Sequence, residues 1–183
     1  ESEVLRETQL VVCLLFQYAG MSFVDFAHLK ERNIKNGILD YNRQKTGTPM
    51  RLEILDTAEL MRKELMGDKK PASGYLFPFL SGTKTGYEAY LEYNAALSRF
   101  NRNLKTLKEV AGIASDVTSY TIRHSFAMAL KEQNVPIEMI SELLGHKSIK
   151  TTQIYLRSFS LEKMTVVNKS CFENVYNYMP EVG

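Results

Sequence analysis

The stretch that decides the fold is Leu-Gly-His-Lys-Ser-Ile-Lys-Thr-Thr-Gln-Ile-Tyr-Leu at residues 144–156. It places His146 directly after a glycine and Tyr155 near its end, with eight residues between the two. Upstream, Ser-Tyr-Thr-Ile-Arg-His-Ser-Phe-Ala at residues 119–127 has Arg123 at its centre. A tyrosine supplies an oxygen nucleophile, an arginine neutralises phosphate charge, and a histidine holds or passes a proton. Together they make a set able to hold a phosphodiester and attack it.

Each member of this set also has an ordinary structural role. The predicted helix around Arg123 has one broad apolar face, which is made of Ile122, Phe126, Ala129 and Leu130. This face is expected to be the core side, with Arg123 at its edge, where arginines commonly form structural ion pairs. His146 follows the end of a predicted helix, where a histidine often contacts the last carbonyls. No single residue therefore indicates catalysis, and the chemical interpretation depends on the order of all three residues in the chain.

Apolar periodicity and capping residues predict a mainly α-helical chain. The predicted helices cover approximately residues 3–18, 23–30, 56–67, 87–111, 119–134, 136–145, 148–156 and 160–178. The expected N-terminal caps are Ser22, Asp56, Thr118 or Ser119, and Ser148. Residues 67–86 are rich in Gly, Pro, Ser and Lys and predict an exposed loop.

A small antiparallel sheet is predicted within residues 34–54. Asn36 and Gly37 lie between two short apolar runs, which is a strong local hairpin signal. A third strand follows, in which Met50, Leu52 and Ile54 alternate with charged residues. The sequence therefore predicts three strands, with Lys45 in the second turn.

Length and composition fit one domain, or one domain cut from a longer protein. A net charge of +2 is weak evidence for a nucleic-acid partner. Cys13 and Cys171 form neither a disulfide framework nor a Cys-x-x-Cys metal pair, and they suit reduced packing residues in a cytoplasmic protein. The most apolar run, residues 10–16, is too short to span a bilayer, so no membrane segment is expected.

The order of these motifs resembles the catalytic domain of the tyrosine recombinases, the phage integrase family. That domain has an arginine after the first helix, then a lysine in a sheet turn, then His-x-x-Arg, and finally Leu-Gly-His and a tyrosine. The resemblance covers essentially the whole chain, and the spacing from His146 to Tyr155 is its most specific part. Residues 20–25 are also similar to integrases of Bacteroides-type mobile elements. The resemblance implies a recombinase catalytic domain over residues 1–183, with an N-terminal DNA-binding region outside them.

The resemblance also implies a role for each residue at the site. Tyr155 would be the nucleophile that forms a 3′-phosphotyrosine, and Arg123 would bind the non-bridging phosphate oxygens. Lys45 would protonate the departing 5′-oxygen. His146 would hydrogen-bond the phosphate or assist proton transfer. No metal, ATP or other cofactor is implied.

Two positions depart from the family pattern. Tyr120 stands where the family has the histidine of His-x-x-Arg, and it is expected to face the site still. Ser22 stands where the first arginine belongs, and Ala19 occupies the position where related integrases carry a substitute. Losing a transition-state cation costs about a thousandfold in rate. Arg43 is the candidate replacement.

The partner implied is a double-stranded DNA recombination site. The residues expected to contact it beside the site are Arg43, Lys147, Lys150 and Arg157. Two further basic clusters either contact DNA or form solvated faces, namely Lys30, Arg32 and Lys35, and Arg99, Arg102, Lys105 and Lys108. The predicted helix at residues 160–178 either packs on its own domain or docks into a neighbouring subunit of a homotetramer.

Three functions remain open. The first is a site-specific recombinase of the bacterial cytoplasm and nucleoid, which integrates or excises a mobile element. The second is a catalytically impaired DNA-binding accessory protein of the same fold, which Ser22 and Ala19 favour. The third is topoisomerase-like relaxation, which the short helical domain and the integrase-like spacing make the poorest fit.

Overall fold

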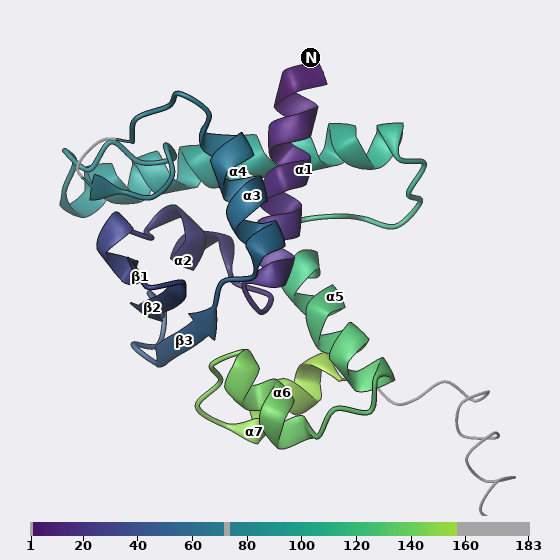
Figure 1. Ribbon diagram of the computed structural model, residues 1–183. Coiled ribbons are helices and arrows are strands. Elements are labelled where there is room, and N and C mark those ends of the chain that lie inside the picture. The colour runs from purple at the N-terminus through teal and green to yellow at the C-terminus, as the bar shows by residue number, and fades with distance from the viewer. Residues whose placement is uncertain (1, 72–73, 157–183) are drawn as a thin grey trace, which may run out of the picture.

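The computed structural model describes residues 2–71 and 74–156 of the chain (Figure 1). Its elements are α1 (Ser2–Gln17), α2 (Phe23–Ala27), the 3-10 helix η1 (Glu31–Asn33), β1 (Ile34–Lys35), β2 (Ile38–Asn42), β3 (Pro49–Glu53), α3 (Asp56–Met66), α4 (Gly86–Val110), α5 (Ser119–Glu132), α6 (Ile137–Leu143) and α7 (Ile149–Tyr155). The strands form one antiparallel sheet in the order β1-β2-β3. The predicted fold class, mainly helical with one three-stranded sheet, is confirmed. The predicted helix at residues 160–178 lies outside the described residues.

Helix α1 is the centre of the larger part of the molecule. It contacts α3, α4 and α5, and Leu14 and Leu15 are fully buried on it. The chain leaves the helix through Ala19 and Gly20, which both have positive φ angles. A Cβ at Gly20 would lie 2.9 Å from a ring carbon of Phe126 on α5, so glycine allows α5 to approach this turn closely.

The sheet follows the predicted pattern. Asn36 and Gly37 have φ angles of 51° and 75°, as the two central residues of a tight hairpin require. In the second turn, the backbone N–H of Arg43 donates to Thr48 O at 2.9 Å. Lys45 is exposed in this turn, as predicted.

The predicted helix caps at Thr118 and Ser148 are confirmed, the cap at Ser22 is confirmed in position only, and the cap at Asp56 is wrong. The hydroxyl of Thr118 caps α5 and that of Ser148 caps α7. Asp56 already belongs to α3, whose N-cap is Leu55. Ser22 occupies the N-cap position of α2 but makes no capping bond, because its hydroxyl donates to a carboxylate instead. The hydroxyl of Ser22 is thus bonded to the side chain of Asp25 and not to a backbone N–H of the helix.

The buried apolar residues in the described part of the chain form two clusters. The larger one unites α1–α4 and the sheet, which we call the main body (residues 2–71 and 74–122). The smaller one contains Ala127, Ile140 and Leu144 and belongs to what we call the C-terminal unit (residues 126–156). Figure 1 shows α5 leading from the end of α1 to α6 and α7. Arg123 therefore lies at the junction of the two parts.

No helix in residues 2–71 or 74–156 is both long and apolar enough to cross a membrane.

Candidate active site

Arg123 is buried, with 5% of its surface exposed. Its Nη1 donates to Gly20 O at 2.8 Å, and its Nη2 donates to Leu144 O. Nη2 also lies 3.3 Å from His146 Nε2. Arg123 can be buried because backbone carbonyls from two other segments accept its N–H groups.

Arg43 reaches the same place from the turn between β2 and β3. It is 8% exposed, and its Nη1 donates to Leu144 O at 3.2 Å and to Gly145 O at 3.1 Å. Its Nε lies 3.4 Å from a carboxylate oxygen of Asp25, which is itself buried. Two guanidinium groups thus meet at one carbonyl oxygen, that of Leu144, and concentrate positive charge there.

The carboxylate of Asp25 is held by two further donors. The Ser22 hydroxyl donates to Asp25 Oδ2 at 2.5 Å, and the backbone N–H of Gln44 donates to Asp25 Oδ1 at 2.7 Å. With Arg43, these bonds connect the start of α2 to the sheet turn. The sequence identified Ser22 as the position of the missing family arginine and Arg43 as the candidate replacement, but it gave no sign that the carboxylate of Asp25 contacts both residues.

Gly145 is required by this packing. Its φ angle is +61°, a conformation that side chains rarely adopt. A Cβ there would lie 2.8 Å from Arg43 Cδ and would also collide with the sulfur of Met50. The glycine in Leu-Gly-His therefore makes room for the arginine and for β3.

His146 lies between the arginines and α7. Its Nε2 is next to Arg123, and its Nδ1 lies 2.9 Å from the hydroxyl of Thr152, which is fully buried. Partial burial, together with the positive charges of Arg123 and Arg43, lowers the pKa of His146 to about 4. His146 is therefore neutral at pH 7. The sequence analysis missed Thr152, although its place in the stretch at residues 144–156 was a signal.

Tyr155 is in the last turn of α7, three residues after Thr152. Residues three apart lie on the same side of a helix. The backbone of Tyr155 is therefore on the side of α7 on which Thr152 contacts His146, one turn further along the helix. The side chain of Tyr155 lies outside the described part of the structure.

The remaining predicted site residues are close in the chain to the residues of this centre. Tyr120 is 60% exposed in the first turn of α5, one turn before Arg123. Lys45 is exposed two residues after Arg43, while Lys147 and Lys150 are exposed at the start of the α7 segment. Arg157 lies outside the described residues.

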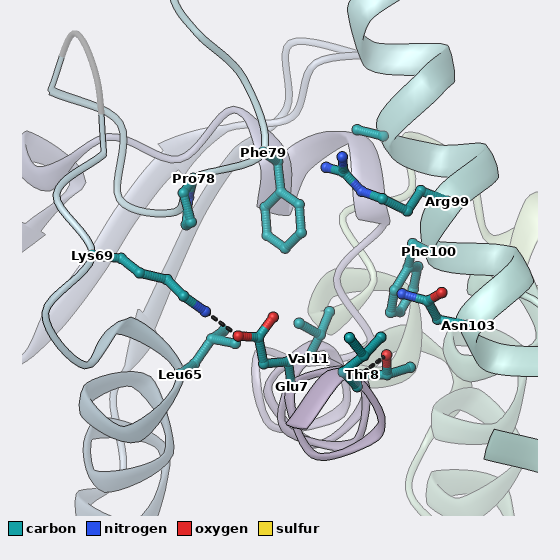
Figure 2. A pocket seen from close by; sticks show the side chains of 12 residues that line it. Glu7, Thr8, Val11, Leu65, Lys69, Pro78, Phe79, Arg99, Phe100 and Asn103 are labelled. Carbon is teal, nitrogen blue, oxygen red and sulfur yellow. Dashed lines mark hydrogen bonds and ion pairs between the residues drawn. The ribbon is translucent and has the colours of Figure 1, made fainter. Parts of the chain in front are cut away.

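Within the described residues, no group of three or more His, Cys, Asp or Glu side chains is placed to hold a metal ion. A pocket of about 380 Å³ lies elsewhere, between α1, α3 and α4 (Figure 2). An ion pair of Glu7 and Lys69 and the rings of Phe79 and Phe100 line it. Among the described residues that line this pocket, none is a candidate catalytic residue.

Comparison of the chain with known proteins identifies a family model and several similar proteins. Residues 3–162 match the model of the phage integrase family. The tyrosine recombinase XerD of Lacticaseibacillus casei is 42% identical over 69 residues, which are 38% of this chain and 24% of the relative. The tyrosine recombinase XerC of Rickettsia typhi is 41% identical over 75 residues, which are 41% of this chain and 24% of the relative. The matched part thus spans about a quarter of each relative's length.

Solved structures share the fold at low sequence identity. The XerA recombinase has a TM-score of 0.64 at 21% identity, over 92% of this chain and 63% of that chain. The Tn1549 transposon integrase in complex with a circular intermediate DNA has a TM-score of 0.63 at 14% identity, over 88% of this chain and 57% of that chain. With the family model matching residues 3–162, these findings show that the chain belongs to the phage integrase family.

Proposed function

We propose that this chain is the catalytic domain of a site-specific tyrosine recombinase, which cuts and rejoins DNA strands through a 3′-phosphotyrosine on Tyr155. The observation that carries the proposal is the convergence of Arg43, Arg123 and His146 on the turn at residues 144–146. This turn directly precedes the helix that bears Tyr155. Two fixed cations and a neutral imidazole beside a candidate nucleophile suit phosphoryl transfer without a bound metal.

Arg43 takes the part of the missing first arginine. Ser22, which stands at that arginine's position in the sequence, bonds to the same oxygen of Asp25 that Arg43 contacts. The guanidinium of Arg43 therefore lies beside the position of Ser22, although it comes from a different element. A guanidinium has five N–H donors, and the bonds described for Arg43 use its Nε and Nη1. The donors on Nη2 can bind a phosphate oxygen.

In the proposed reaction, the hydroxyl of Tyr155 gives its proton to water as its oxygen forms a bond to phosphorus, and the bond from phosphorus to the 5′-oxygen breaks. Lys45, in the turn next to Arg43, gives a proton to that 5′-oxygen. Arg123 and Arg43 stabilise the negative charge that develops on the non-bridging oxygens. The phosphotyrosyl bond keeps the energy of the broken bond, so a second 5′-hydroxyl can reseal the strand by the reverse steps.

The proposed partner is a double-stranded recombination site at the end of a mobile element, for integration or excision. Lys147 and Lys150 are exposed next to the site, where they suit phosphate contacts. The Tn1549 relative is a transposon integrase in complex with DNA, and the lambda integrase relative is a dimer bound to a core site, which supports DNA as the partner. A homotetramer on DNA, coupled through residues 160–178, and an additional N-terminal DNA-binding region belong to the same proposal.

The alternative is a DNA-binding accessory protein of the same fold with impaired chemistry. Ser22 and Ala19 favour it, because neither can supply the cation that the family has there. The position of Arg43 argues for the enzyme.

The test is covalent trapping on DNA. Nicked duplexes that tile the ends of the element carrying the gene are incubated with the protein and with its Tyr155→Phe variant. We expect a protein–DNA band that resists SDS and is absent for the variant, while both proteins shift the same duplex on a native gel. A native shift without any covalent band for the unmodified protein would instead support the accessory protein.

The role of Arg43 is tested with the same assay. Arg43→Lys keeps the charge but loses the planar fork, and we expect covalent complex formation to slow by about a hundredfold. Arg51→Lys on β3, which is exposed, is the matched control and should cleave at the rate of the unmodified protein. Equal rates for the two variants would remove Arg43 from the proposed machinery.

A further inference from the structure

Thr152 is fully buried, and its hydroxyl lies 2.9 Å from His146 Nδ1, whereas neighbouring Thr151 is exposed. The arrangement of the histidine ring follows from its two neighbours. Arginine has only N–H donors, so the Nη2 group of Arg123 can contact His146 Nε2 favourably only where Nε2 carries a lone pair. Because His146 is neutral at pH 7, its proton is then on Nδ1, which donates to the oxygen of Thr152.

A bound phosphate reverses this requirement. Phosphate oxygens accept hydrogen bonds, so a neutral imidazole can contact one only through an N–H at Nε2. The proton on Nδ1 must then be absent, and Nδ1 needs a donor. A hydroxyl both donates and accepts, so Thr152 can satisfy Nδ1 in either state without movement of the ring.

We propose that Thr152 is a positioning residue, whose hydroxyl pairs with His146 Nδ1 in both tautomers of the ring and so holds the ring in place while the tautomer changes. In the DNA-free site its oxygen accepts from Nδ1–H, and on phosphate binding its O–H donates to Nδ1 while Nε2–H donates to the phosphate. One proton leaves Nδ1 to water and one joins Nε2 from water, so the charge of the ring does not change. The inference rests on the proposed function, because only a chain that binds a DNA phosphate at this site needs His146 as a donor to that phosphate.

The hydrogen bond between Thr152 and His146 also connects His146 to α7. Thr152 and Tyr155 are on the same short helix, and α7 contacts α5 and α6. The bond to His146 therefore also fixes the helix of the nucleophile relative to Arg123. A histidine ring held by an apolar side chain instead would lose one hydrogen bond in each state.

The experiment pairs two substitutions that differ in the hydroxyl. Thr152→Val keeps the branched shape and removes the hydroxyl, whereas Thr152→Ser keeps the hydroxyl and removes a methyl group. Thr151→Val is the control on the exposed neighbour. The protein contains three histidines, so the imidazole nitrogens can be resolved by NMR of protein labelled with ¹⁵N-histidine. Denaturant unfolding of each variant verifies that it is folded.

For the free protein, we expect His146 to carry its proton on Nδ1, with the same state in Thr152→Ser and a mixture of tautomers in Thr152→Val. In the Tyr155→Phe background with a bound nicked duplex, the proton should be on Nε2. Cleavage by Thr152→Val should be about tenfold slower, as expected for one lost hydrogen bond. Cleavage by Thr152→Ser and by Thr151→Val should stay within about threefold of the unmodified rate.

Two results would overturn the inference: an Nε2–H tautomer in the free unmodified protein, or equal tautomers and cleavage rates for Thr152→Val and Thr152→Ser. The spectrum of the free unmodified protein needs neither a variant nor DNA. Failure of the proposed function is distinct, because the unmodified protein would then form no covalent complex at all.

Discussion

The main body and the C-terminal unit are stabilised by different interactions. The main body is built on large apolar side chains, including an aromatic stack of Phe26 and Phe77 with ring centroids 4.1 Å apart. The C-terminal unit has a small cluster around Ile140 and Leu144. Bonds from buried arginines to carbonyls connect the two parts. The same guanidinium groups thus form the candidate site and join the parts, so assembling the site and docking the unit are one event.

Removing Arg43 should break this connection most severely. Arg43→Met leaves the buried carboxylate of Asp25 without its cation and removes both bonds to the unit. Breaking a buried ion pair in this way costs about 3–5 kcal/mol. Urea unfolding measures it. Arg51→Met, on the exposed face of β3, should change the free energy of unfolding by less than about 0.5 kcal/mol. Similar values for the two variants would show that the junction does not depend on Arg43.

Removing Arg123 should have a smaller and more local effect. Arg123→Met leaves Gly20 O without this donor, while Leu144 O keeps its bond from Arg43. An unsatisfied buried carbonyl costs about 1–3 kcal/mol. Hydrogen exchange should then show faster exchange in residues 126–156 than in α1. Uniform acceleration across both parts would contradict the division into a body and a unit.

Gly145→Ala should destabilise the junction by about 2 kcal/mol, from its positive φ angle and from collision with Arg43 and Met50. Gly37→Ala separates the two causes. Gly37 also has a positive φ angle, but nothing lies near its Cβ position, so this variant should lose only about 1 kcal/mol. Equal losses of stability for the two variants in thermal unfolding would mean that Arg43 and Met50 move away from the added methyl group at no cost in free energy.

The pH dependence of stability should show the smallest effect. The pKa of His146 is about 4 in the folded protein, below the ordinary value of 6.5 expected for the unfolded chain. The unfolded chain therefore binds this proton more tightly, so stability is complete above about pH 6.5 and decreases as the pH falls toward 4. His146→Gln should reduce the loss of stability between pH 7 and pH 5, measured as the change in urea midpoint. An unchanged loss would show that His146 titrates normally.

The sequence predicted those features that depend on neighbouring residues. Asn36 and Gly37 formed the expected hairpin, and Thr118 and Ser148 formed the expected caps. Local patterns succeed here because turn geometry and capping bonds involve atoms only a few positions apart. Ser22 is at the predicted N-cap position, but it makes no capping bond, and its hydroxyl donates to Asp25 of the same helix.

The residues of the candidate site likewise differ in whether neighbouring sequence or distant contacts determine them. The sequence by itself determined the set of Arg123, His146 and Tyr155, because their spacing within and between two short segments is visible in the chain. The sequence named Arg43 only as a candidate replacement, and the tertiary structure decided that it joins them, since Arg43 is 101 residues from Leu144 and meets it through folding of the sheet turn against α6. Burial of Arg123 and the lowered pKa of His146 have the same origin. Both depend on carbonyls and charges that distant segments bring within hydrogen-bonding or Coulombic reach.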